Sequence, residues 1–129
     1  MDELTELGRA CSDEAVTNGR LELPVRWLRS YWDEEDVTYF FEADEDGWVL
    51  RQIELRGPDK TPAVASALSE WTNADRDGLG AVQAYEATYG ALADKPITEW
   101  DAGFPHVEIG QPEFGDTWER ARAYLERSK

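Results

Sequence analysis

The chain has 129 residues, of which 28 are acidic and 13 are basic, so its formal net charge is −15. This length fits one domain with a sizeable core, and the 41% of apolar residues excludes a disordered chain. The charge opposes binding to nucleic acid or to an anionic membrane, because phosphates would be repelled. It favours either a basic protein as the partner or solubility alone.

Residues 1–20 form an N-terminal segment that the pattern predicts to be a short amphipathic helix at most. Leu4, Leu7 and Cys11 recur at helical spacing, and Asn18-Gly19 would end the helix. The chain starts Met1-Asp2-Glu3, where a signal peptide would carry Lys or Arg, and no apolar run has the length of a membrane span. A lone cysteine leaves no internal disulfide and suits a reducing compartment, so we expect a cytoplasmic protein.

Residues 21–66 predict an antiparallel sheet, because apolar and polar residues alternate in successive short segments. The three clearest segments are Leu21 to Trp27, Val37 to Glu42 and Trp48 to Arg56. Asp46-Gly47 is a strong hairpin signal, and Gly57-Pro58-Asp59 ends the third segment as a turn. A brief fourth strand is predicted between Pro62 and Ser66.

Residues 67–129 are predicted to form the second half of the domain, which consists of helices and loops. Ala67 to Trp71 has a helical pattern, Asn73 to Gly80 is expected to break it, and Ala81 to Tyr89 forms a second helical run with Gly90 as its C-cap. The stretch 94–110 holds proline and glycine together with apolar side chains, which predicts a loop held against the domain surface.

The last helix is the clearest element. Phe114, Trp118, Ala121 and Leu125 recur as one apolar stripe after Pro112, which suits a first helical position. On its polar side two spacings allow ion pairs, Asp116 with Arg120 and Glu119 with Arg122.

These patterns predict one α+β domain spanning 1–129. A three- to four-stranded antiparallel meander packs against the C-terminal helix and one or two middle helices. We expect these helices to cover one face of the sheet, because an aromatic sheet face and an apolar helical stripe bury each other.

Eight carboxylates and no basic residue lie between Ser30 and Leu50, in two clusters on either side of an aromatic strand. The first cluster, Asp33 to Asp36, follows Trp32 and is longer than a tight turn requires. Opposite charge speeds capture of a basic partner, and aromatic side chains make binding hot spots. This favours a protein-binding module, for example a bacterial immunity or inhibitor protein that masks a cationic partner. The predicted contact residues are Trp32, Asp33, Glu34, Glu35, Asp36, Asp44 and Asp46.

Two segments resemble a calcium-binding loop, and both lack its closing glutamate. In Glu42 to Gly47 the closing position falls on Ile53, so a charged hairpin explains this segment better. Asn73 to Gly78 lies between two helical runs but would close at Ala84. One histidine and one cysteine also exclude a His-rich zinc site. We expect no cofactor and no metal, and the binding of a cation at Asn73 to Gly78 stays open.

The alternative hypothesis is a small-molecule-binding protein or enzyme, with a pocket between the sheet and residues 100–109. Arg51 and Glu54 are charged side chains within a strand, and Arg51 shares a face with Val49 and Ile53, so it needs a partner. His106 is the only histidine. Its neighbours do not form a catalytic motif, and the sequence predicts no catalytic residue.

The order of these residues resembles a family of small bacterial proteins, some from actinomycetes, that has no established activity. The family pattern has a tryptophan in the first strand, an acidic hairpin tip, a strand with R-x-[VI]-E, and a helix with E-F-x-x-x-W. The positions that match are Trp27, Phe41 to Gly47, Trp48, Arg51, Ile53, Glu54, Leu55, Ile109, Glu113, Phe114 and Trp118. The resemblance implies the same α+β fold and supplies no functional site.

Overall fold

The computed structural model describes residues 25–97 and 105–127. The predicted N-terminal helix, the first residues of the predicted first strand, and Trp100 and Phe104 lie outside these ranges.

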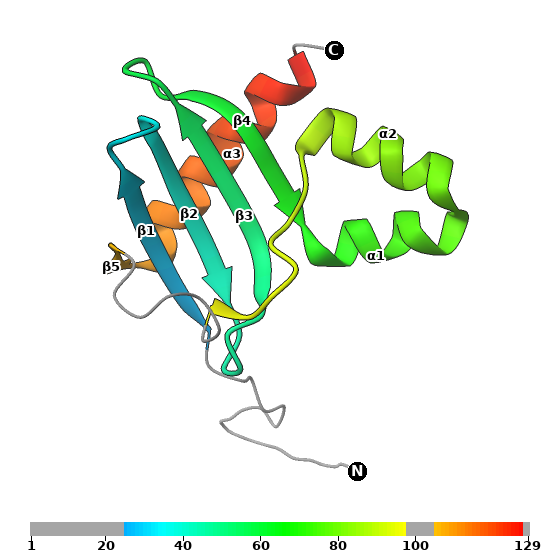
Figure 1. The fold of residues 1–129 in the computed structure, drawn as a ribbon, viewed down its shortest axis with the longest axis horizontal. Coiled ribbons are helices and arrows are strands. Elements are labelled where there is room, and N and C mark those ends of the chain that lie inside the picture. The colour runs from blue at the N-terminus through cyan, green and yellow to red at the C-terminus, as the bar shows by residue number, and fades with distance from the viewer. Residues whose placement is uncertain (1–24, 98–104, 128–129) are drawn as a thin grey trace.

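The core of the fold is one five-stranded antiparallel sheet with the order β4-β3-β2-β1-β5 (Figure 1). The strands are β1 (Arg26–Trp32), β2 (Val37–Ala43), β3 (Val49–Arg56), β4 (Thr61–Ala67) and β5 (Val107–Ile109). The first four follow one another as a meander, so the predicted α+β fold is confirmed. The fifth strand was not predicted, because three residues are too few to show an alternating pattern.

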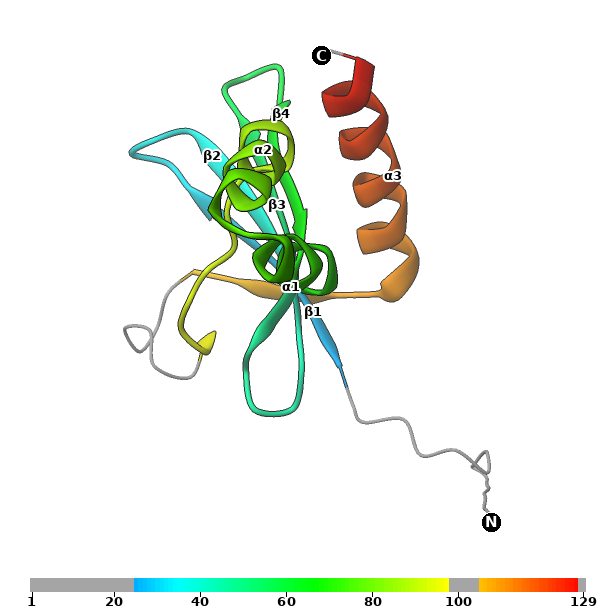
Figure 2. The same ribbon diagram turned by 90° about the vertical axis from the view of Figure 1, so that its right-hand side faces the viewer.

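The C-terminal helix α3 (Gln111–Arg127) covers one face of the sheet, as Figure 2 shows with the sheet nearly edge-on. Its predicted stripe is confirmed: Phe114 and Ala121 are fully buried against Phe40 and Ile53 of the sheet. Trp118 and Leu125 pack around this cluster. Burial of these side chains is the main favourable term that fixes α3 on the sheet.

The opposite face is covered by the segment from Gly90 to Ile97, which crosses it without regular structure (Figures 1 and 2). The backbone amide of Ile97 donates to the carbonyl of Gly47 over 2.7 Å, and that of Ala93 donates to the side chain of Gln52 over 2.8 Å. Gly90 has a φ of +87°, and an added Cβ would lie 2.6 Å from Val64. Only glycine lets the chain turn this close to the sheet.

One correction to the predicted sheet comes from this face. The pairing register of β2 and β3 shifts between Glu42 and Ala43, so Val49 lies opposite Ala43. Val49 therefore packs with Phe41 on this face and does not share a face with Arg51, as predicted from simple alternation. Leu28 is fully buried in the same cluster.

The middle helices are α1 (Leu68–Asp77) and α2 (Leu79–Tyr89). The expected break between Asn73 and Gly80 was wrong in extent, because α1 continues to Asp77 and only Gly78, at a φ of +113°, separates the two helices. The expectation that they cover the same face as α3 was also wrong. They lie beside the β4 edge of the sheet, as both ribbon views show (Figures 1 and 2).

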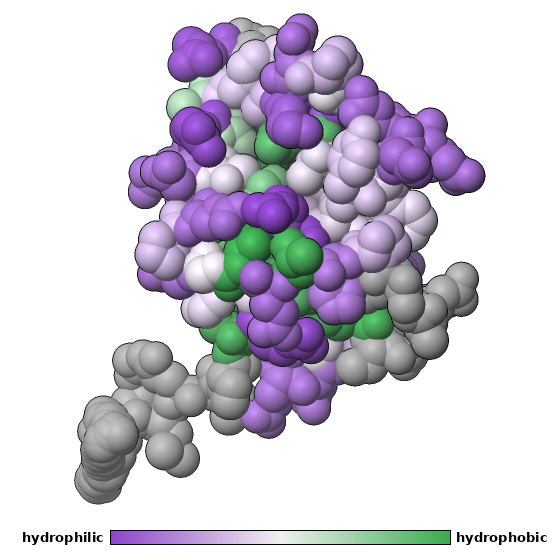
Figure 3. Space-filling view, turned by 90° about the vertical axis from the view of Figure 1, so that its left-hand side faces the viewer, coloured by the Kyte–Doolittle hydropathy of each residue, from purple (hydrophilic) through white to green (hydrophobic). Residues whose placement is uncertain are grey.

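Both edges of the sheet are protected by side chains. At the β4 edge, Tyr85 of α2 accepts a hydrogen bond from the amide of Ala67 over 2.9 Å, and Arg122 of α3 donates to the carbonyl of Ala65 over 2.8 Å. At the other edge, β5 has three residues and bears one charged side chain, Glu108. The side of the molecule with β1 and β5 is largely hydrophilic around a hydrophobic centre (Figure 3). Short, charged or covered edges disfavour pairing with another chain.

None of the helices in the described ranges is long and apolar enough to cross a membrane.

Candidate functional site

The first acidic cluster forms the turn between β1 and β2. Asp33, Glu34 and Glu35 are exposed, and none of them forms an ion pair with a residue in the described ranges. Trp32 precedes them with 39% of its surface exposed. Its indole N–H donates to the hydroxyl of Ser30 over 2.8 Å, and this bond fixes the ring. The turn thus presents three carboxylates without an ion pair to the described residues, beside an anchored aromatic ring.

Asp36, the last residue of the turn, has a structural role. Its φ of +53° is in the left-handed region, where aspartate is tolerated better than most residues. Its carbonyl accepts the amide of Gly57 over 2.8 Å, and its carboxylate accepts the hydroxyl of Tyr31 over 3.0 Å. The latter bond raises the pKa of Tyr31. Asp36 therefore shapes the turn and differs from the three carboxylates before it.

The second acidic cluster forms the turn between β2 and β3, and Asp44 organises it. One carboxylate oxygen of Asp44 accepts the backbone amides of Asp46 and Trp48, each over 2.9 Å. This is an Asx turn, in which the aspartate is needed for the backbone conformation and no metal is required. Glu45 and Asp46 are exposed at the tip.

The two acidic turns lie at opposite ends of β2. The strand has seven residues, which separates the turns by roughly 23 Å at the usual rise of a strand. The predicted contact residues therefore form two separate patches, with Trp32 to Asp36 at one end and Asp44 to Asp46 at the other.

Arg51 has the partner that its position requires, and the partner comes from the neighbouring strand. Its guanidinium donates to both carboxylate oxygens of Glu42, over 2.7 and 2.9 Å, and stacks 4.9 Å from the rings of Phe114 and Trp118. The indole of Trp27 donates to the same carboxylate over 3.0 Å. Burial raises the pKa of Glu42, but the bonds and charge of Arg51 and the bond from Trp27 outweigh it, so the pKa lies below its ordinary value.

The other two residues of the alternative pocket lie elsewhere. Glu54 is on the face of the sheet opposite Arg51, where it accepts a hydrogen bond from Arg56 over 3.0 Å. His106 is exposed just before β5. In the sheet, β5 is separated from β3 by β1 and β2. Arg51, Glu54 and His106 are thus not brought together. Residues 100–109 were expected to form one wall of that pocket, and the structure describes them only from Pro105 onward.

The segment at which cation binding was left open, Asn73 to Gly78, is helical up to Asp77. Side chains two apart on a helix do not face a common centre, so Asn73, Asp75 and Asp77 do not form a coordinating loop. Within the described residues there is also no group of three or more metal-ligating side chains.

The most elaborate polar network in the described part of the chain surrounds Arg122, and sequence reasoning missed it. The Arg122 guanidinium forms an ion pair with Glu70, donates to the hydroxyl of Tyr85 over 3.3 Å, and stacks 3.9 Å from the ring of Tyr89 and 4.4 Å from that of Trp118. We call these five residues the arginine junction. The bonds from Arg122 lower the pKa of Glu70, against the opposing effect of burial.

The arginine junction replaces the surface pair that the spacing of Glu119 and Arg122 predicted. Its members come from all three helices, and Arg122 also reaches β4 through Ala65. On a helix, an arginine three residues after a glutamate predicts an ion pair on the exposed side. The signal for burial was the position of Arg122 next to the apolar stripe, between Ala121 and Leu125.

No family model, curated protein or solved structure matches the chain.

Proposed function

We propose that this protein is an acidic protein-binding module that docks a basic protein through Trp32, Asp33, Glu34 and Glu35, which we call the acidic docking surface. The observation that carries the proposal is the group of three exposed carboxylates without an ion pair in the described ranges, next to a fixed and partly exposed tryptophan. Free charges and a rigid aromatic side chain supply steering and an anchor, respectively.

The net charge of the whole chain also supports the docking of a basic protein. A net charge of −15 attracts a basic partner from a distance and raises the rate of encounter. The turn between β2 and β3 adds to this field from the far end of β2, and the proposed contact lies at the acidic docking surface. A cationic toxin, neutralised by its immunity or inhibitor protein, is a partner class with the required chemistry.

The test compares two variants with the same change in charge. The docking variant carries Asp33→Asn, Glu34→Gln and Glu35→Gln, and leaves Asp36 intact because it shapes the turn. The control variant carries Glu45→Gln, Asp46→Asn and Asp75→Asn, all exposed and away from the surface. Each variant and the wild type serve as bait in a pull-down from the native host, at about 0.15 M salt, where long-range attraction is screened.

We expect the wild type and the control variant to capture the same basic protein and the docking variant to lose it. Equal capture by the docking variant would contradict the proposal. Equal loss with both variants would show that overall charge, and not the acidic docking surface, holds the partner.

A further inference from the structure

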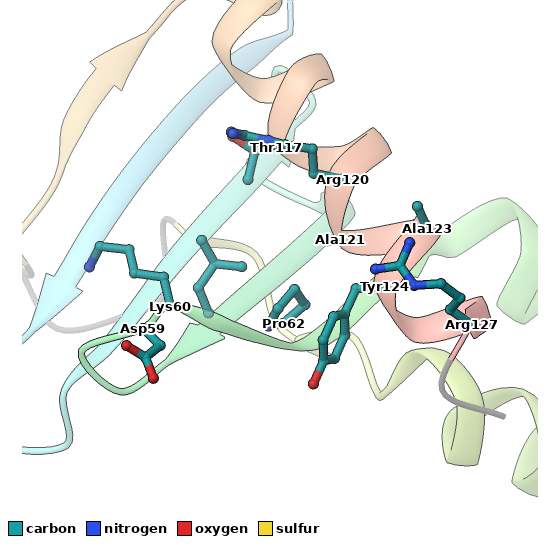
Figure 4. Close-up of a pocket in the computed structure, with 10 residues that line it drawn as sticks. Asp59, Lys60, Pro62, Thr117, Arg120, Ala121, Ala123, Tyr124 and Arg127 are labelled. Carbon is teal, nitrogen blue, oxygen red and sulfur yellow. The ribbon is translucent and has the colours of Figure 1, made fainter.

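A second site with the opposite charge lies between α3 and the hairpin that joins β3 to β4 (Figure 4). It is a groove of about 530 Å³. Its apolar surface comes from Leu55 and Pro62 on the sheet and from Ala121 on the helix. The volume is within the range of pockets that hold small organic ligands.

Basic side chains dominate the rim of this groove although acids dominate the chain. Lys60, Arg120 and Arg127 line it, and Asp59 is the one carboxylate among the lining residues. In the described ranges, the arginines that pair with carboxylates are Arg26, Arg29, Arg51, Arg56 and Arg122. None of the three basic groups of the groove is among them.

The contacts of these basic side chains show whether their charge is neutralised within the protein. Lys60 is held by the hydroxyl of Thr38 at 3.3 Å and lies 5.5 Å from the ring centre of Tyr31, and neither contact neutralises it. Arg120 has the spacing for a pair with Asp116 but does not form it. In Figure 4 the guanidinium of Arg127 is directed back along the helix toward Ala123, and that of Arg120 lies beside Thr117.

We propose that this groove binds a small organic anion, a carboxylate or phosphate monoester with an apolar body. The body would lie on Leu55, Pro62 and Ala121, and the anionic group would be held by the arginines, whose planar guanidinium matches both head groups. Carboxylates farther away than the screening length, about 8 Å at physiological salt, weaken this attraction only modestly. Glu113 and Asp116 lie nearer, because they line the adjoining hollow with Lys60 and Arg120. The site is separate from the acidic docking surface and takes a ligand of the opposite charge.

The experiment follows amide signals by two-dimensional NMR while small probes are added. The anionic probes are hexyl phosphate and hexanoate, and the matched controls are hexanol, hexylamine and inorganic phosphate. We expect saturable shifts at Leu55, Ala121 and Ala123 with the two anionic probes below about 10 mM, a range suited to so small a ligand. The controls should bind at least about fivefold more weakly, because each lacks either the charge or the body.

Variants then assign the binding to the groove. Arg120→Gln with Arg127→Gln should weaken hexyl phosphate binding about five- to tenfold, since two exposed charge-assisted contacts are lost. Arg76→Gln removes an exposed arginine on α1 and should leave it unchanged. Ala123→Glu places a carboxylate at the groove on an exposed helical position, so it should also weaken binding without disturbing the core.

Four results would overturn the proposal. Equal binding of hexanol would show an apolar surface with no preference for anions. Equal binding of inorganic phosphate would show attraction to the charges alone. Unchanged binding in the arginine double variant, or no saturable shift with either anionic probe, would show that the groove is not the site.

Discussion

The arginine junction and the acidic docking surface use charge in opposite ways. At the junction every charged group has a partner: Arg122 is bonded to Glu70 and Tyr85 and enclosed by two rings. At the docking surface Asp33, Glu34 and Glu35 have no ion pair within the described ranges. The first arrangement joins three helices to the sheet, and the second leaves charge available for another molecule.

Charge density in the sequence therefore does not locate the charges on which the fold depends. The longest run of acids lies at an exposed turn, whereas the central ion pair joins Glu70 and Arg122, which are 52 residues apart in the chain. A charge that is removed from water needs hydrogen bonds and a counter-charge, and removal of one partner is costly. The predictions below separate the two uses of charge by their effect on stability.

The largest effect is expected for Arg122→Met. The substitution keeps a long side chain between the rings but removes the donor to the carbonyl of Ala65 and the counter-charge of Glu70, to which the hydroxyl of Tyr85 still donates over 2.7 Å. The free energy of unfolding should therefore fall by about 2–3 kcal/mol. Urea unfolding followed by tryptophan fluorescence measures it. Arg120→Met, on the exposed side of the same helix, is the control and should cost less than about 0.5 kcal/mol. A similar loss in both variants would contradict the assigned role of the junction.

Asp44→Ala should have the next largest effect. The substitution removes the acceptor of two backbone amides in the turn between β2 and β3, which should cost about 1–2 kcal/mol. Asp46→Ala at the same tip removes an exposed carboxylate and should cost less than about 0.5 kcal/mol. The midpoint of thermal unfolding of the two variants makes the comparison. An equal change in both would show that the charge of the tip, and not the Asx turn, is what matters.

Stability should also depend on pH through Glu42 and Glu70. The pKa of each is lowered in the folded protein from an ordinary value of 4.5. The unfolded chain therefore binds protons first, so the contribution is fully present above pH 4.5 and is lost as the pH falls through the folded pKa. Unfolding in urea at several pH values between about 7 and 3 measures the slope.

The matched variants for this slope are Glu42→Gln and Glu45→Gln. Glu42→Gln should flatten the fall in stability at acid pH, because the carboxyl of the partly buried pair with Arg51 no longer titrates. Glu45→Gln removes an exposed carboxylate and should leave the slope unchanged. An unchanged slope in Glu42→Gln would mean that the Glu42–Arg51 pair does not contribute to acid sensitivity.

The sequence predicted most of the fold and little of its polar interior. The meander and the stripe of α3 could be predicted because periods of two and 3.6 residues are local signals. The partner of Arg51 could not, because Glu42 becomes its neighbour only through the pairing of β2 with β3. The predicted length of β2 already implied that the two acidic turns lie far apart. The prediction that residues of both turns contact the same partner did not take this separation into account.

The smallest effect on stability is expected at the acidic docking surface itself. Asp33→Asn, Glu34→Gln and Glu35→Gln together should change the free energy of unfolding by less than about 0.5 kcal/mol, since these side chains are exposed and form no ion pair with the described residues. Equilibrium unfolding in urea checks this in the variant used for the pull-down. A loss above about 1 kcal/mol would show that the turn needs its charges for folding. The lost capture would then no longer distinguish a docking surface from a damaged turn, so the stability of this variant decides how the binding experiment is read.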